Sequence, residues 1–353
     1  MKRFVISILA LLIVAGLSSC TKEPSGTFDE GVFQPKYKIS TIKLNNANFQ
    51  TWNWASSKLS GINDITNNAT YSFSYTGNQL TNTQIAYADG SSQNIQYTYS
   101  GDYLTRVEVY NGSRADISMT VNHNASDKIS TVNIDVSDAF LIEAGLSVMN
   151  GTFSFKMGAA RYLLSETAFE SLMTMAQLYA VASKNNAKYS IDNKHFSITY
   201  TWNGDNVATE AFAGNVNASV TVDDISQVIG SSSPMISAIL NYLDADAEYP
   251  LDINVERTTN YTYDDKGNPY WYCWTSGFDA QNLSKNNILT DNATGAGTGN
   301  ITVTLPIVGT STYPIQNVDL SHSLSYTYSY NKKKYPTQIT ISTGEVYELE
   351  YTK

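Results

Sequence analysis

Cys20 carries the chemistry that the sequence specifies most fully. The chain opens with the basic pair Lys2-Arg3, continues with an almost wholly apolar run over residues 4–17, and reaches Cys20 through two serines. This order is typical of a cleaved bacterial export signal that ends at a lipid-modified cysteine, since the apolar run is short for a permanent membrane helix. We expect loss of residues 1–19 and attachment of the mature chain to a membrane by acyl chains, such as palmitate, on Cys20.

The tryptophans are a second set of candidate functional residues, because an aromatic ring can stack on a sugar or a peptide. Trp52 and Trp54 share one face of their segment if it is extended, and residues 270–274 (Tyr-Trp-Tyr-Cys-Trp) are predicted to form a strand with rings on both faces. Filling a core is the more ordinary use of such rings. The candidate ligand-binding residues are therefore Trp52, Trp54, Trp271 and Trp274, with a core role as the alternative.

Local motifs for catalysis or metal binding do not occur in the sequence. The three histidines are far apart, and lipid on Cys20 leaves Cys273 as the other cysteine without a partner. We therefore predict no metal, no cofactor, no internal disulfide and no catalytic residue. Two carboxylates that hydrolyse a glycan can come from separate strands, and such a pair gives no recognisable motif in the sequence. A glycan hydrolase therefore stays open as the alternative.

The charge balance argues against nucleic acid as a partner. The chain has 22 Lys and Arg against 32 Asp and Glu, a net charge of −10, and loss of Lys2 and Arg3 with the signal makes it more acidic. Phosphate backbones are bound chiefly through basic side chains, so we expect no nucleic-acid partner.

The elements that must position these residues are predicted to be β-hairpins. Tyr71, Phe73 and Tyr75 alternate with small polar residues, and Gly77-Asn78 then supplies a turn. The pattern recurs at residues 97–109, 200–205, 261–268 and 326–335. A period of two indicates a strand, and Gly or Asn suits a hairpin turn. We predict a mainly β fold, an antiparallel meander of repeated hairpins that forms a curved sheet or barrel-like roll.

Apolar residues at helical spacing interrupt this pattern. We expect helices near 138–148, 165–183 and 224–244, the second with a capping box formed by Thr167 and Glu170. These helices are expected to pack on the sheet. The predicted organisation is a signal over residues 1–19, a lipidated flexible tether over 20–36, and a single β-rich domain over 37–353.

The Tyr-x-Tyr strands and Gly, Asp or Asn turns resemble the tyrosine-aspartate repeats of bacterial surface proteins. Together with the lipidation signal and the closing segment around Tyr328, Tyr330, Lys332 and Tyr335-Pro336-Thr337, they resemble a group of Bacteroidota lipoproteins of unknown function whose domain is described as porin-like in fold. The resemblance covers roughly residues 37–353 and implies a fold and an envelope location. It carries over no catalytic residue.

These observations predict a noncatalytic envelope lipoprotein, anchored to the outer membrane and facing either the cell surface or the periplasm. We expect a monomer that serves as a binding or structural accessory for a glycan or for another envelope protein. A lipid-anchored sheet outside the bilayer is favoured over a barrel that crosses it, because a spanning barrel would not need the lipid.

Overall fold

The structure is a computed structural model that describes residues 38–149, 158–183, 191–220, 247–273, 277–305 and 309–352. The predicted signal, the tether with Cys20 and the predicted helix near 224–244 lie outside these residues. Within the described ranges the chain forms seventeen strands and five helices.

The first nine strands follow one another as short hairpins, and later strands are longer. The strands are β1 Lys38–Leu44, β2 Ala47–Ala55, β3 Lys58–Asp64, β4 Ala69–Thr76, β5 Gln79–Tyr87, β6 Ser92–Ser100, β7 Tyr103–Asn111, β8 Arg114–His123, β9 Ile129–Val136, β10 Ile191–Asn203, β11 Asn206–Val220, β12 Tyr249–Gly267, β13 Asn286–Leu305, β14 Gly309–Asp319, β15 His322–Tyr330, β16 Pro336–Ile341 and β17 Val346–Thr352. The helices are α2 Asp138–Met149, α3 Gly158–Leu163, α4 Glu166–Ser183, α7 Pro269–Cys273 and α8 Ala280–Leu283.

All pairings between these strands are antiparallel, and the sheet closes on itself. Each strand from β1 to β13 pairs with the next, and β17 returns to β1, with Lys38 opposite Thr352 and Leu44 opposite Tyr347. Strands β14 and β15 pair with two parts of the same strand, since Ala296 of β13 lies opposite Asp319 whereas Ala293 lies opposite His322. The result is a sixteen-strand barrel, which confirms the meander and refines the predicted roll.

Inward and outward positions alternate as the period of two requires. Tyr71 and Phe73 of β4 are buried, whereas Ser72 and Ser74 between them are exposed. Buried apolar residues continue this inner face around the wall, including Ile85, Ile95, Val107, Met119, Val132, Ile198, Phe212 and Ile253. The outer face is lined by exposed polar residues, including Thr70, Gln96, Thr98, Thr120, Asn122, Thr258, Asn260, Asn292, Thr294, Ser323, Ser325 and Thr327.

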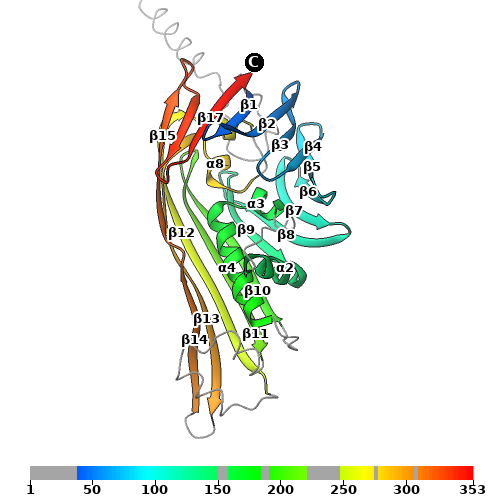
Figure 1. Cartoon of the computed structure of the whole chain (residues 1–353), viewed down its shortest axis with the longest axis vertical. Coiled ribbons are helices and arrows are strands. Elements are labelled where there is room, and N and C mark those ends of the chain that lie inside the picture. Colours follow the sequence, from blue (N-terminus) through cyan, green and yellow to red (C-terminus); the bar gives the residue numbers. More distant parts are fainter. Residues whose placement is uncertain are drawn as a thin grey trace, which may run out of the picture.

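Helices occupy the interior that such a wide barrel would otherwise leave open. Figure 1 shows α4 and α2 beside the long strands β10 and β11, which extend together with β12–β14 beyond the shorter strands. Leu172, Met175 and Ala176 of α4 are buried in the same apolar cluster as the inner faces of the strands. The predicted ranges near 138–148 and 165–183 are helical, and no helix in the described ranges has the length and hydrophobicity to cross a membrane.

Two local predictions are wrong. The cap of α4 is Ser165, whose Oγ accepts a hydrogen bond of 3.0 Å from the backbone N–H of Ala168, and not the predicted Thr167. Residues 264–268 do not form a hairpin turn either. Strand β12 continues through Gly267, which pairs with Asn286 of β13, and α7 and α8 lie between the two strands.

The predicted strand over residues 270–274 is also wrong, because residues 269–273 form helix α7. Asn268 precedes it, and its Oδ1 accepts a hydrogen bond of 3.0 Å from the backbone N–H of Tyr270. Pro269 then occupies the first helical position, where its fixed φ and missing N–H are favourable. The side chain of Cys273 lies outside the described side chains.

Candidate functional site

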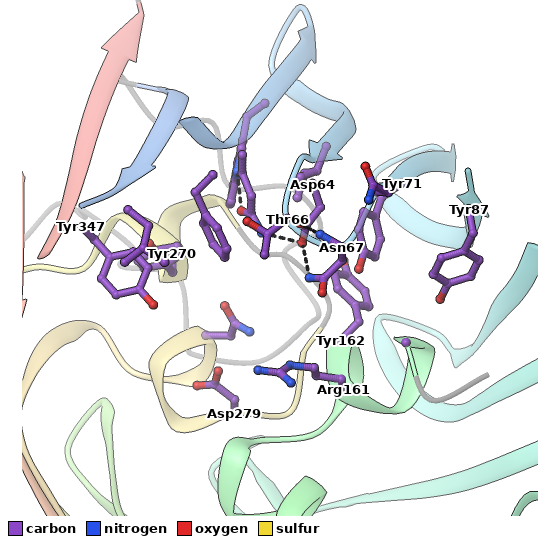
Figure 2. A pocket seen from close by; sticks show the side chains of 18 of the residues that line it. Asp64, Thr66, Asn67, Tyr71, Tyr87, Arg161, Tyr162, Tyr270, Asp279 and Tyr347 are labelled. Carbon is purple, nitrogen blue, oxygen red and sulfur yellow. Dashed lines mark hydrogen bonds between the residues drawn. The ribbon is translucent and has the colours of Figure 1, made fainter. Parts of the chain in front are cut away.

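The candidate site is a cavity of about 1010 Å³ inside the barrel. It lies between the turns that end the short strands and the helices beneath them (Figure 2). Turn residues 66–68 and 88–89 line one side, and α3, α7 and α8 line the other. Helices α2 and α4 lie beside the long strands (Figure 1) and do not line this cavity.

Aromatic rings from four strands and two helices surround this cavity, and several of them contact one another. Tyr71 and Tyr162 have ring centroids 5.0 Å apart, and Trp52 and Tyr270 meet edge to face at 6.2 Å. The complete set of rings comprises Phe49, Trp52, Tyr71, Tyr87, Tyr162, Tyr270 and Tyr347. Rings fixed by neighbours lose little freedom when a ligand packs on them.

A chain of hydrogen bonds fixes the polar side chains beside these rings. Trp52 Nε1 donates to Gln50 Oε1 at 3.1 Å, and Gln50 Nε2 donates to Asp64 Oδ2 at 3.3 Å. Asp64 also accepts from the backbone N–H and from Nδ2 of Asn67, both at 2.9 Å. Asp64 is only 3% exposed, so its carboxylate depends on these donors. The Trp52 ring and the Asp64 carboxylate therefore form one rigid unit.

The floor of the cavity carries Asp279 and Arg161. Figure 2 shows both side chains on the same side of the cavity, on the elements below the turns. Asp279 caps α8 by accepting a hydrogen bond from the backbone N–H of Gln281. Burial raises the pKa of the Asp279 carboxyl to about 6, against the opposing effect of backbone hydrogen bonds. Asp279 therefore caps α8, and its carboxyl group also titrates close to neutral pH.

Tyr87 is held against the start of α3. Its hydroxyl donates a hydrogen bond of 2.8 Å to Gln93 Oε1, and the same oxygen accepts at 3.0 Å from the backbone N–H of Ala159. A side chain at Gly158 would overlap the Tyr87 hydroxyl, so only glycine permits this close approach.

A second cavity of about 320 Å³ adjoins the first and shares Phe49, Gln50, Tyr270, Gln281 and Tyr347 with it. Its further lining residues include Tyr326 and Tyr328 of β15 and Glu166 in the first turn of α4. Desolvation by the surrounding protein is the largest cause of a raised pKa at the Glu166 carboxyl, and the charge of Glu170 adds to it. Together the two cavities form an elongated cleft with aromatic walls and carboxyl groups at several points.

The structure separates the tryptophans that the sequence grouped as candidate ligand-binding residues. Trp52 lines the large cavity. Trp54 lines neither part of the cleft, and its Nε1 donates a hydrogen bond of 2.7 Å to the carbonyl of Ile39. Trp271 is 8% exposed in α7 and is also outside the lining. Trp274 lies outside the described residues, as does the predicted lipidation site Cys20.

Most of the cleft was not predicted from the sequence. The contributing residues, such as Tyr71, Tyr162 and Asp279, come from distant parts of the chain. The alternating tyrosines identified the strand of Tyr71 but not which ring would border a cavity. A local signal did exist for Asp64, since Asp followed by Asn three residues later is typical of a side-chain-stabilised turn.

A scan of protein-family models finds no match to this chain, and a search of curated proteins finds none either. Among solved structures, the chain is similar to a porin-like protein from Bacteroides uniformis ATCC 8492. The identity is 12% and the TM-score 0.23, over 83% of this chain and all of that chain. The closed barrel itself follows from the strand pairing of this chain.

Proposed function

We propose that this chain is a lipid-anchored protein of a bacterial envelope that binds a glycan in the aromatic cleft, without chemical turnover. The observation that carries the proposal is the combination of fixed rings with fixed planar polar groups. A sugar ring has an apolar C–H face that packs on an aromatic ring, and its hydroxyls bond to carboxylate, amide and guanidinium groups. A large concave site with a few oriented polar side chains is the usual form of a small-molecule site.

The envelope location rests on the predicted lipid at Cys20 together with the polar outer face of the barrel. Barrels that cross an outer membrane carry an outward apolar band about 25 Å tall with aromatic girdles. In the described part of this chain the outward positions are mainly Ser, Thr, Asn and Gln, and only Ile65 and Tyr103 are large apolar side chains at least 36% exposed. The polar outer face of the barrel therefore favours contact with water over contact with lipid chains, and the lipid on Cys20 attaches the protein to the outer membrane.

Binding of labelled glycans to the mature protein, purified in detergent, tests the proposal. We expect at least one neutral glycan to bind, and we expect Trp52→Phe to weaken this binding about fivefold, since the smaller ring loses contact worth about 1 kcal/mol. Trp54→Phe is the matched control, because Trp54 lies on the same strand but outside the cleft. Thermal unfolding of both variants checks that the fold is retained.

Failure of every glycan to bind would refute the proposed ligand. A specific envelope protein recovered by cross-linking from intact cells, and displaced by no glycan, would instead support the other partner that the sequence allowed.

A second candidate function is glycan hydrolysis. It is favoured by the raised pKa of Asp279, about 6, because a general acid must hold its proton near neutral pH and a second carboxylate must complete the reaction. Asp64 lines the same cavity. Release of reducing ends that Asp279→Asn abolishes would establish this function, and binding without release would exclude it for the glycan concerned.

A further inference from the structure

We infer that the cleft holds an extended, uncharged oligosaccharide rather than a single sugar or an acidic polysaccharide. This inference rests on the proposed function and specifies the chemical class of its ligand. It is drawn from the placement of the aromatic rings along the cleft and from the signs of the charges between them.

The aromatic rings form two separate platforms. Tyr71, Tyr87 and Tyr162 lie at one side of the cavity, whereas Tyr270 and Tyr347 lie at the other, with Asp64, Arg161 and Asp279 between the two groups (Figure 2). One sugar ring stacks on one platform. A ligand that uses both must therefore contain several linked sugars.

The second cavity prolongs the cleft beyond one of these platforms. It begins at Tyr270 and Tyr347, which it shares with the large cavity, and continues to Tyr326 and Tyr328. An oligosaccharide that lies across the large cavity can thus continue past Tyr347 without leaving an aromatic surface. This continuity favours binding along the chain of a glycan.

The charges along the cleft disfavour an anionic ligand. The large cavity is lined by Asp64, Asp89 and Asp279 against Arg161, and Glu166 adds a further carboxyl group in the adjoining cavity. Unit charges 4 Å apart interact by about 4 kcal/mol near a protein surface, so a carboxylate on a sugar would be repelled at several positions. The net charge of −10 acts in the same direction.

The same carboxylates are poorly placed to select a cationic ligand. Asp64 already accepts hydrogen bonds from Gln50 and Asn67, and Asp279 accepts from the backbone of α8. Arg161 lines the same cavity and already supplies a positive charge there. These donors leave few free acceptor sites on the two carboxylates, which suits a sugar hydroxyl with one donor better than an ammonium group with three.

Titration calorimetry with the full mature protein in detergent tests both parts of the inference. The length series consists of one to six units of the neutral glycan that binds best on an array. We expect affinity to rise at least tenfold between one and three units, and we expect Tyr162→Ala to flatten this rise. Tyr103→Ala is the control, since Tyr103 is exposed and does not line the cleft.

The charge series compares galacturonate oligomers with the same oligomers as neutral methyl esters and with glucosamine oligomers. At low salt we expect the methyl esters to bind at least tenfold more tightly than the free uronates. Asp279→Asn should reduce this difference in affinity between methyl esters and uronates. The cap of α8 should be retained, because Asn is also a good N-cap residue. Added salt should reduce the difference too.

The possible failures are distinguishable. If no glycan of any class binds, the proposed function and this inference both fall. If a glycan binds but a single unit binds as tightly as three, or if uronates or glucosamine oligomers bind more tightly than the neutral esters, the inference is overturned while the proposed function stands.

Discussion

Arg257 on β12 donates a hydrogen bond of 2.6 Å from Nη1 to Oε2 of Glu170 on α4, which joins the barrel wall to a helix inside it. Arg257 is 1% exposed, and its Nη2 also contacts Nδ1 of His322. The other ring nitrogen of His322 lies 2.8 Å from Oδ1 of Asp291. This polar cluster lies where β13 changes its partner from β14 to β15, so it stabilises both the helix and the change of pairing.

Replacing Glu170 by Ala should destabilise the protein by about 2 kcal/mol. Breaking a buried ion pair from one side costs about 3–5 kcal/mol because the remaining charge loses its partner, and the half-exposed position of Glu170 reduces this cost. Urea unfolding measures the change. Glu256→Ala, at an exposed position of the same strand, is the control and should change the free energy of unfolding by less than about 0.5 kcal/mol. Equal effects of the two substitutions would show that the Arg257 pair does not stabilise the fold.

The carboxyl group of Glu210 should make the stability of the barrel fall with rising pH. Glu210 is fully buried, where its carboxyl contacts Ser165 and accepts a hydrogen bond of 3.2 Å from Tyr261, and burial raises its pKa from 4.5 to about 8. The folded state therefore keeps a proton that the unfolded chain loses above pH 4.5. Stability is fully present below that pH and declines until about pH 8.

Glu210→Gln tests this linkage, since an amide cannot ionise. We expect the stability of the variant, relative to the unsubstituted protein, to increase steadily between pH 5 and pH 8 in urea unfolding. Glu256→Gln supplies the comparison at an exposed site and should show a difference of less than about 0.5 kcal/mol at each pH. A constant difference for Glu210→Gln over this range would contradict the proposed protonation.

Much of the barrel wall was predictable because its rules are local. Alternation of Tyr71, Phe73 and Tyr75 with small polar residues predicts an inward aromatic face, and Gly77 has the positive φ of 59° that its hairpin turn needs. The closure of the barrel has no such signal. Closure depends on pairing between β1 and β17, at opposite ends of the described chain. The sequence of one strand does not indicate which distant strand it pairs with.

Helix α7 and the cleft show two further limits of sequence reasoning. Tyr and Trp favour strands, so the run at residues 270–274 suggested β structure, but Asn268 and Pro269 together start a helix and override that preference. The cleft brings Asp64 and Asp279 to one cavity from positions far apart in the chain. Only the closed fold makes them neighbours, so their spacing in the sequence is uninformative.

Gly158→Ala should disturb the edge of the cleft. The added Cβ would overlap the Tyr87 hydroxyl and lie 2.9 Å from its ring carbon Cζ, so the ring must move and its hydrogen bond to Gln93 must break. We expect a loss of about 1–3 kcal/mol in stability, the usual cost of overpacking. Tyr87→Phe in the same protein removes the overlapping hydroxyl and should recover part of that loss. The four proteins form a double-mutant cycle, and strictly additive effects would show that the two side chains do not interact.

Cys20→Ser should release the protein from membranes. If lipid on Cys20 is the attachment, a Cys20→Ser protein exported without residues 1–19 has, in the part of the chain that the structure describes, no apolar outer surface large enough to hold it in a bilayer. Fractionation of cells by ultracentrifugation should find the unsubstituted protein with the membranes and the variant in the supernatant. Cys273→Ser is the control and should remain with the membranes. A Cys20→Ser protein that stays membrane-bound after a high-salt wash would show that the barrel contacts lipid directly, because salt removes only electrostatic attachment.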